Sequence, residues 1–243
     1  MPADETTVAQ AVGLCKSFGP RHVLDRLSFT LRRGQMLGLV GANGGGKTTT
    51  LRVLAGLAKP DDGTVRVFGR DPRRLTTADR RRIGYMSQSH ALYPDLTLSE
   101  NLRFRAALLD GPIEAAVSDV ARYCGIEHLL AERIAHLSGG WARRAQFAAL
   151  LVGRPALLLL DEPTSGLDIL TRRTMWGWMR SLADAGHAIV ISTHDLVDAE
   201  SCSDVMYYTA QGVTGPMKPS SLAAMHDAPD LETLVAASTV QRV

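Results

Sequence analysis

The sequence predicts an α/β protein with a mostly parallel sheet, an antiparallel β region near its N-terminus and an all-helical subdomain inserted into the chain. Three compact apolar runs, at residues 36–40, 157–160 and 189–192, are typical of parallel strands that are buried on both faces. Helical periodicity follows the first run and separates the other two. Residues from about 96 to 153 show helical patterns with no convincing strand, which indicates the insertion.

The N-terminal residues alternate between apolar and polar positions, a pattern that predicts short antiparallel strands. The apolar positions are Val8, Val12, Leu14, Val23, Leu27, Phe29 and Leu31. The run at 36–40 is followed by a glycine cluster and then by residues 48–55, whose apolar side chains have helical spacing. A strand, a glycine-rich loop and a helix in this order begin an α/β unit with a parallel sheet.

The inserted helical region begins at Thr97, whose capping-box pattern with Glu100 opens an apolar-periodic helix. Two further helices are expected near residues 113–124 and 140–152. Another helix, over residues 171–185, connects the last two buried strands.

These elements predict a single domain over residues 1–243. Its α/β core, with the antiparallel region, comprises residues 1–90 and 154–212, and the helical subdomain comprises residues 91–153. Residues 213–243 contain glycine, prolines and a weak helical pattern, and we expect them to form a short C-terminal appendage.

The composition excludes some classes of protein. The apolar fraction is 45%, the charged fraction is 21% and the formal charge is +2, which suits a soluble globular protein and not a dedicated nucleic-acid binder. Arginines cluster at residues 73–74, 80–82, 143–144 and 172–173. Because acidic residues lie near these clusters, we interpret them as solvated helix faces.

Cysteine usage and hydropathy indicate the compartment. Three cysteines, at positions 15, 124 and 202, are too widely spaced for a disulfide framework or a zinc site, which favours a reducing environment. The acidic N-terminus does not resemble a signal peptide, and the longest aliphatic run, residues 156–160, is far shorter than the roughly 20 residues of a membrane-spanning helix. We expect a soluble cytoplasmic protein that reaches a membrane only through a partner.

A glycine-rich segment after the first buried strand matches the phosphate-binding pattern GxxxxGK[ST]. It consists of Gly41, Ala42, Asn43, Gly44, Gly45, Gly46, Lys47 and Thr48, and Thr49 follows it directly. Glycines let backbone N–H groups approach phosphate oxygens closely, and the helix that begins here turns its positive dipole end toward the same anion. The pattern predicts that Lys47 bridges the β- and γ-phosphates of a nucleotide and that the Thr48 hydroxyl ligates Mg²⁺. The alternative, a glycine-rich turn without a ligand, is disfavoured by the strand–loop–helix context.

Two carboxylates end the apolar run at 157–160. Asp161 is placed to hold Mg²⁺, directly or through water, as an acidic residue does at this strand end in P-loop NTPases. Glu162 is placed to polarise the attacking water as a general base. Alone, the run is equally consistent with a buried strand that meets a solvated capping acid. Together with the phosphate loop, it favours the catalytic interpretation and a P-loop NTPase (RecA-like) core.

A second candidate anion site precedes the acidic strand end. In the segment Leu137-Ser138-Gly139-Gly140, a serine cap and two glycines leave N–H groups and a hydroxyl at the start of a helix. Alone, such a segment is usually an ordinary helix cap. In order after a phosphate loop and before Asp161 and Glu162, it resembles the signature motif of the ABC ATPase family. The resemblance extends over about residues 8–209.

The resemblance implies roles for four further residues. Phe18 is similar to the aromatic residue that stacks on adenine in this family, although a small core aromatic is the alternative. Gln88 resembles the Q-loop glutamine, which contacts Mg²⁺ and the attacking water and is coupled to the transport subunit. Asp168 matches the D-loop aspartate, which acts across the dimer interface, and His194 matches the switch histidine that contacts the γ-phosphate.

One residue departs from the family pattern. Trp141 stands where the family usually has glutamine, directly after the signature glycines. The departure leaves the phosphate contacts in place and puts in doubt how the opposing subunit packs at this point.

The resemblance also implies an assembly. Two subunits enclose two ATP molecules, with Lys47 of one subunit facing Ser138, Gly139 and Gly140 of the other. This subunit powers an ABC transporter at the cytoplasmic face of the cell membrane, through separate transmembrane permease subunits, as a homodimer or paired with a second ATPase subunit. Residues 92–97 and 230–232 resemble those of ABC-2-type exporters of drugs and related compounds.

The segment 88–101 is expected to receive a helix of the membrane subunit, because it joins the catalytic glutamine to the helical insertion. Its apolar side chains are Ala91, Leu92, Tyr93 and Leu96, for which packing inside the domain is the alternative. A soluble mechanical ATPase of the same superfamily, acting on ribosomes or DNA, is a second interpretation. The single set of motifs and the lack of a basic tail disfavour it, so no nucleic-acid partner is expected. The sequence also lacks the NKxD motif of a GTPase, and a kinase has no use for LSGG.

Overall fold

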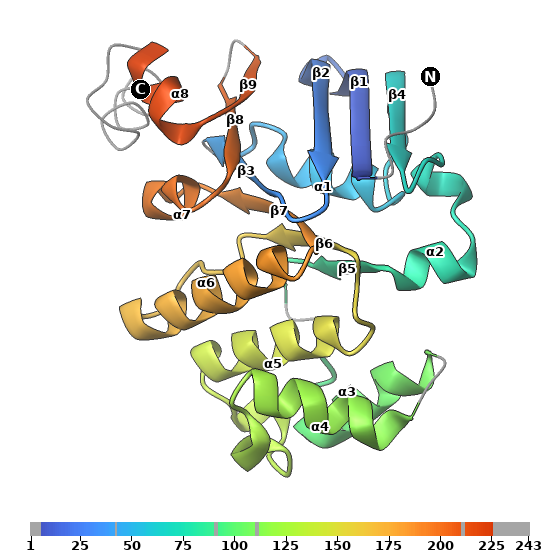
Figure 1. The fold of residues 1–243 in the computed structure, drawn as a ribbon, viewed down its shortest axis with the longest axis vertical. Helices are drawn as coiled ribbons and strands as arrows, with labels where there is room; N and C mark the ends of the chain where they lie inside the picture. Colours follow the sequence, from blue (N-terminus) through green and yellow to red (C-terminus); the bar gives the residue numbers. More distant parts are fainter. Residues whose placement is uncertain (1–5, 42, 90–91, 110–111, 210–211, 226–243) are drawn as a thin grey trace.

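The computed structural model describes residues 6–41, 43–89, 92–109, 112–209 and 212–225, which form two β-sheets and a set of helices (Figure 1). The strands are β1 (Thr7–Phe18), β2 (Arg21–Arg32), β3 (Met36–Gly41), β4 (Asp62–Val67), β5 (Ile83–Met86), β6 (Leu157–Asp161), β7 (Ala188–Thr193), β8 (Asp204–Tyr208) and β9 (Val213–Met217). The helices are α1 (Lys47–Leu54), α2 (Thr77–Arg81), α3 (Leu98–Ala107), α4 (Ile113–Tyr123), α5 (Gly139–Leu151), α6 (Ile169–Asp184), α7 (Leu196–Glu200) and α8 (Pro219–Met225). Short 3-10 helices cover Pro72–Arg74, Glu127–Leu129 and Ile134–His136.

The N-terminal residues form a three-stranded antiparallel sheet in the order β2-β1-β4. Strands β1 and β2 have 12 residues each, so they are longer than the short strands that the alternation predicts. The register between them shifts at several points, for example between Ala11 and Leu14. Such bulges let a strand continue through positions where strict alternation breaks, which explains the extra length.

The second sheet has six strands in the order β5-β6-β7-β3-β8-β9, and its first five strands are parallel. Every residue of β3, β6 and β7 is buried, as the apolar runs predict. The leucines of β6 alternate between two cores. Leu158 and Leu160 face the core formed with the helical subdomain, whereas Leu157 and Leu159 face the core formed with α1 and the antiparallel sheet. Figure 1 shows these two layers on opposite sides of the central sheet.

The inserted region is helical, as predicted, and contains α3, α4 and α5. The capping box at its start is formed: the Thr97 Oγ1 accepts the Glu100 N–H at 3.2 Å, and the Glu100 carboxylate accepts the Thr97 N–H at 2.7 Å. Helix α5 lies between this subdomain and the sheet, and nine of its side chains are buried. It therefore has contacts in both subdomains. The fold predicted from the sequence, with its antiparallel region, mainly parallel sheet and helical insertion, is confirmed.

The predicted boundary at residue 213 does not match the structure. Strand β9 pairs antiparallel with β8 and forms an edge of the central sheet, so residues 213–217 belong to the core. Leu222 and Ala223 of α8 are also buried in that core. An edge strand of 5 residues whose positions are only partly buried gives little apolar pattern, which is why the sequence did not reveal it. Within the described ranges, no helix is long and apolar enough to cross a membrane.

Candidate active site

The predicted site residues gather where parallel strands of the central sheet end, as expected for an open α/β sheet. Two hollows lie at this edge. The larger hollow, of about 580 Å³, is lined by Phe18, Arg21, Val23, Asn43, Gly44, Gly46, Lys47, Thr48, Thr49, Gln88 and Glu162. The smaller hollow, of about 310 Å³, is lined by Gln88, Gly139, Arg143, Glu162, Ser165, Gly166 and Leu167. Gln88 and Glu162 line both hollows.

Two positions of the glycine-rich segment at the end of β3 require glycine. Gly41 has φ 140°, and an added Cβ would lie 2.2 Å from the carbonyl oxygen of Tyr208. Gly46, the N-cap of α1, has φ 111°, and a Cβ there would lie 2.7 Å from the carbonyl oxygen of Val23. The loop therefore wraps closely around the start of α1, whose first N–H groups and dipole favour an anion. Ala42, another predicted loop residue, lies outside the described residues.

Lys47 is held inside this loop. Its side chain is buried, and its Nζ donates a hydrogen bond to the carbonyl oxygen of Gly41 at 2.6 Å. Burial lowers the pKa of Lys47, and the nearby carboxylates of Glu162 and Asp161 oppose that effect. A compact cation fixed beside N–H donors makes the loop a site for an oxyanion.

Asp161 links the loop to the neighbouring strands. Its Oδ1 accepts hydrogen bonds from the Thr48 hydroxyl at 3.1 Å and from the Ser192 hydroxyl at 2.5 Å. A carboxylate and a hydroxyl this close together are hard oxygen ligands, which is the donor set that Mg²⁺ prefers. The predicted pair Thr48 and Asp161 is therefore brought together by the fold and fits the ion.

Glu162 is the residue after β6 and has an unusual backbone. Its φ is 48°, in the left-handed region that glycine favours, and its N–H donates to both the hydroxyl and the carbonyl oxygen of Ser192, at 2.9 and 3.1 Å. The side chain is nearly buried, and its Oε1 lies 3.1 Å from Nδ1 of His194. A carboxylate oriented by an imidazole at the edge of a hollow is an arrangement that can take a proton from water.

Sequence reasoning missed Arg143, which fixes the backbone around Glu162. We interpreted the cluster 143–144 as a solvated helix face, and that interpretation is wrong for Arg143, whose exposed fraction is 5%. Its guanidinium donates to the carbonyl oxygens of Asp161, Glu162 and Pro163, at 3.1, 2.5 and 3.0 Å. Burial lowers its pKa, against the raising effect of the Asp161 and Glu162 carboxylates.

The same guanidinium also holds the segment that carries Gln88. Its Nη1 donates to the carbonyl oxygens of Ser87 and Gln88, both at 3.2 Å, and to the side chain of Gln146 at 3.1 Å. Arg143 therefore joins α5 to both predicted catalytic segments. A signal was present in the sequence: Arg143 stands four residues before Phe147, on a face of α5 that is buried.

A second residue that was missed is Asp198, which is buried and ties the segments that follow β6 and β7 to α6. It accepts hydrogen bonds from the hydroxyls of Thr164 and Thr193 and from the indole N–H of Trp176. Nε of Arg172 also donates to it, at 2.8 Å. Arg172 was expected on a solvated face, and this ion pair shows that expectation to be wrong. No sequence motif joins these residues, because their positions are far apart in the chain.

Some predicted residues lie apart from the Lys47 hollow. Ser138 is the N-cap of α5 by position, but its side chain makes no capping hydrogen bond within the described chain. Asp168 caps α6: its Oδ1 accepts from the N–H groups of Leu170 and Thr171, both at 3.0 Å. Ser138 and Asp168 are exposed and Gly140 is half-buried, and none of the three lines the hollow that contains Lys47. Phe18 lines the larger hollow and is 56% exposed.

Trp141, the departure from the family pattern, packs within its own subunit. Its ring meets that of His128 edge-on, with ring centroids 5.2 Å apart. The guanidinium of Arg144 lies over the Trp141 ring, 4.5 Å from its centroid. The contact with His128 holds the start of α5 against another segment of the helical subdomain.

The chain is similar to a known protein family and to several of its members. The model of the family described as ABC transporter matches residues 24–165, which is more than half of the chain. The chain is 38% identical over 202 residues to Nod factor export ATP-binding protein I of Ralstonia nicotianae, covering 82% of this chain and 63% of that protein. It is 35% identical over 202 residues to the probable multidrug ABC transporter ATP-binding protein YbhF of Escherichia coli, covering 82% of this chain and 35% of that protein. It thus spans less than two thirds of the length of either relative.

A solved structure described as the ATP binding subunit of an ABC transporter has the same fold. Its TM-score is 0.84 at 28% sequence identity, and the superposition covers 96% of this chain and 100% of that one. Because the family model, the relatives and the fold all agree with the site geometry, we conclude that this chain belongs to the ABC transporter family.

Proposed function

We propose that this chain binds Mg-ATP at the Lys47 hollow and hydrolyses it as the ATP-binding subunit of an exporter. The observation that carries the proposal is the convergence of Lys47, Asp161, Glu162 and His194 at one edge of the central sheet. The loop N–H groups and Lys47 bind the phosphates, and Phe18 stacks on the adenine from the exposed rim of the hollow. Its exposed ring, with the Lys16 ammonium 5.3 Å from the centroid, supports this role.

The Thr48 hydroxyl and the Asp161 carboxylate would hold Mg²⁺, and Gln88, which also lines the hollow, would be a further ligand. The bound ion would supply positive charge that offsets the charge of the phosphate groups. The protein supplies the rest of the chemistry. Glu162 takes a proton from the attacking water, and His194 orients the Glu162 carboxylate and reaches the γ-phosphate.

The chain works as a dimer in which the second subunit completes each site. Ser138 and the glycines after it offer a hydroxyl and bare N–H groups at the start of α5, and that surface lies outside the Lys47 hollow of its own subunit. Next to Asp168, the side chains of Ile169 and Leu170 are 72% and 73% exposed. Adjacent apolar side chains with this much exposure support an interface between subunits.

The chain drives transport through membrane subunits that dock at the segment 88–101. The relatives named for Nod factor export and for multidrug transport support export as the direction and small molecules as the cargo. Leu92 is buried and Leu96 is half-buried, whereas Tyr93 is 53% exposed and is therefore available to a partner. Ala91 lies outside the described residues.

The test is the substitution Glu162→Gln, which removes the base and keeps the shape of the side chain. We expect ATP turnover to fall by at least about a hundredfold, because a general base contributes 10²–10⁴-fold. We also expect the variant to form a stable dimer with Mg-ATP in size-exclusion chromatography and to be monomeric with ADP. The matched control is Glu114→Gln, an exposed carboxylate on α4, which leaves turnover unchanged. Wild-type turnover in Glu162→Gln, or a monomer at saturating Mg-ATP, would contradict the proposal.

A further inference from the structure

Positive charge is concentrated in residues 59–82, which run from the end of α1 through β4 to α2. This segment has eight basic and four acidic residues, so its formal charge is +4, whereas that of the whole chain is +2. The rest of the chain therefore carries a small negative charge. A separation of charge of this kind indicates a surface for an anionic partner.

A basic hollow of about 570 Å³ lies at β4 and the turn that follows it. The charged residues that line it are Arg66, Arg70, Arg73, Arg74 and a single acid, Asp71. All four arginines are exposed. Because the surface is concave, their charges add to the potential at one place and attract an anion more strongly than they would on a flat face.

Two carboxylates offset part of this charge. Asp71 pairs with Arg73 at 2.6 Å, and Asp79 lies 3.6 Å from both Arg70 and Arg82. Nη1 of Arg66 donates to the carbonyl oxygen of Gly69 at 3.1 Å, a bond that leaves its charge uncompensated. The hollow therefore keeps a positive net charge.

Helix α2 extends the basic hollow. Nη2 of Arg80 donates to the carbonyl oxygen of Arg73 at 3.1 Å, and the guanidinium of Arg82 lies over the Phe68 ring, 3.9 Å from its centroid. Both contacts join the α2 region to the turns after β4. The name arginine surface is used below for the following residues: Arg66, Arg70, Arg73, Arg74, Arg80 and Arg82.

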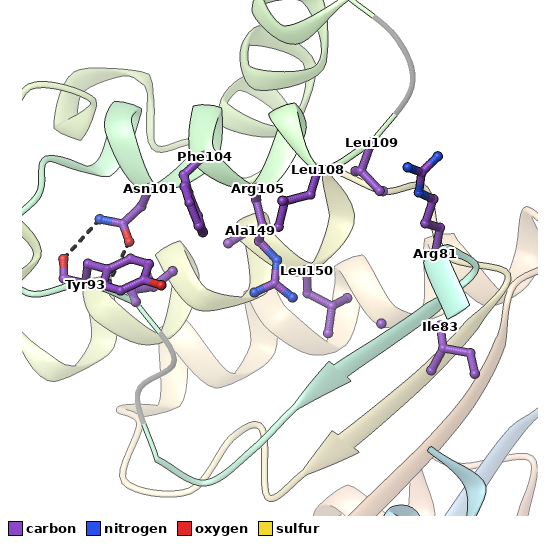
Figure 2. Close-up of a pocket in the computed structure, with 13 residues that line it drawn as sticks. Arg81, Ile83, Tyr93, Asn101, Phe104, Arg105, Leu108, Leu109, Ala149 and Leu150 are labelled. Carbon is purple, nitrogen blue, oxygen red and sulfur yellow. Dashed lines mark hydrogen bonds between the residues drawn. The ribbon is translucent and has the colours of Figure 1, made fainter. Parts of the chain in front are cut away.

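The arginine surface is next to the segment at which membrane subunits are proposed to dock. Arg81, which follows Arg80 in α2, lines one end of a separate hollow, and Tyr93 of the segment 88–101 lines the other end (Figure 2). Figure 1 shows α2 between β4 and α3 on the same side of the molecule. A transporter that holds Tyr93 against its membrane subunit therefore turns the arginine surface toward the same membrane.

We propose that the arginine surface binds the phosphate groups of anionic phospholipids in the membrane leaflet that the transporter faces. Arginine recognises phosphate through its planar set of N–H donors, and basic residues close to an anionic leaflet are attracted to it. The orientation rests on the proposed docking of membrane subunits. A soluble phosphate ester offers the same chemistry and is distinguished by the experiment below.

RNA is disfavoured as the anionic partner. The described residues that line the basic hollow include no aromatic side chain on which a base could stack. The overall formal charge of +2 is also small for a nucleic-acid binder. A lipid surface needs only the charge and the N–H donors.

The test measures cosedimentation of the purified chain, without nucleotide, with vesicles of equal parts phosphatidylglycerol and phosphatidylcholine in about 0.1 M salt. We expect binding to these vesicles and none to phosphatidylcholine alone. The double variant Arg70→Gln and Arg74→Gln should bind roughly 30-fold more weakly, since each basic residue near an anionic surface contributes about fivefold to affinity. Its melting temperature and ATP turnover should match the wild type, because exposed ion pairs contribute little to stability.

The matched control removes the same charge from another part of the molecule. Arg173→Gln with Arg180→Gln changes two exposed arginines of α6, which lies at the opposite side in Figure 1. This variant should bind within about twofold of the wild type, because charges more than about 10 Å from the lipid are screened. An equal loss in both variants would assign binding to overall charge and overturn the proposal, as would a wild type that ignores the anionic vesicles.

The two other phosphate sources and the docking have readouts of their own. If millimolar glycerol 3-phosphate releases the chain from vesicles, or if the chain binds polyuridylate more tightly than vesicles through the same two arginines, the lipid is the wrong ligand. The docking is tested by Tyr93→Glu, which should abolish copurification with a membrane subunit and leave vesicle binding unchanged. If Tyr93→Glu still copurifies, the docking is wrong although the lipid binding stands.

Discussion

Replacing Arg143 with methionine tests the role of a residue that no motif identified. The guanidinium donates six hydrogen bonds, five of them to backbone carbonyls of the Gln88 and Glu162 segments. Its side chain is 5% exposed, so water does not replace these donors. Hydrogen bonds from a charged group each contribute about 1.5–3 kcal/mol, but they share one side chain and are not additive. We expect a loss of about 3–5 kcal/mol in the free energy of unfolding, the range found when one partner of a buried charge network is removed.

Kinetic measurements distinguish a role of Arg143 in positioning the catalytic segments from a role in folding stability alone. Arg143→Lys keeps the charge but loses the planar fork that reaches both segments, and it should remain folded. In that variant we expect kcat for ATP to fall about 10²-fold, the effect of misplacing a reacting group by about 1 Å, with little change in KM. The assays are urea unfolding followed by circular dichroism and steady-state phosphate release. Arg144→Met on the same helix is the control, because its ring contacts contribute about 1 kcal/mol or less. Unchanged unfolding in Arg143→Met together with unchanged kcat in Arg143→Lys would refute the reasoning.

Two further predictions concern buried charges. Asp198→Asn keeps the size of the side chain but removes the charge that pairs with Arg172; we expect a loss of roughly 3 kcal/mol in urea unfolding and a lower kcat, because the residue fixes Thr193 beside His194. A free energy of unfolding within about 0.5 kcal/mol of the wild type, which is the range of ordinary surface substitutions, would contradict this prediction. Lys47→Met should abolish ATP binding in titration calorimetry and yet raise the melting temperature of the nucleotide-free chain at neutral pH. Burial lowers the folded-state pKa of Lys47, so between that value and its unfolded value of 10.5 the unfolded chain binds more protons and wild-type stability rises with pH. The advantage of Lys47→Met should therefore shrink toward pH 10, and an advantage that grows with pH would show that the sign is wrong.

The sequence predicted the parts of the fold that depend on local patterns. The apolar runs of β3, β6 and β7 are buried strands because a parallel sheet covered on both faces requires them. The phosphate loop was recognisable because Gly41 and Gly46 adopt backbone conformations that other residues rarely adopt. In each case one short segment carries the whole signal.

The sequence did not predict features that depend on several distant segments. The spacing of Arg143 to Phe147 indicates a buried position, but the bonds that its guanidinium makes depend on how α5 packs against two strand ends. Asp198 is recognisable only once Thr164, Arg172 and Thr193 have been brought together by folding.

The left-handed backbone of Glu162 limits how far the thermal stability of this protein can be raised without a loss of ATP turnover. A residue other than glycine or asparagine in that region is strained by about 1–2 kcal/mol. The Glu162 backbone is held there by the hydrogen bond that its N–H donates to the Ser192 hydroxyl and by the one that its carbonyl oxygen accepts from Arg143. Glycine or asparagine at position 162 would relieve that strain, so a library screened for heat resistance alone should enrich both and lose turnover as it does. Selection for heat resistance and selection for ATP turnover thus favour different residues at position 162. Screens of this chain therefore need an activity criterion from the first round.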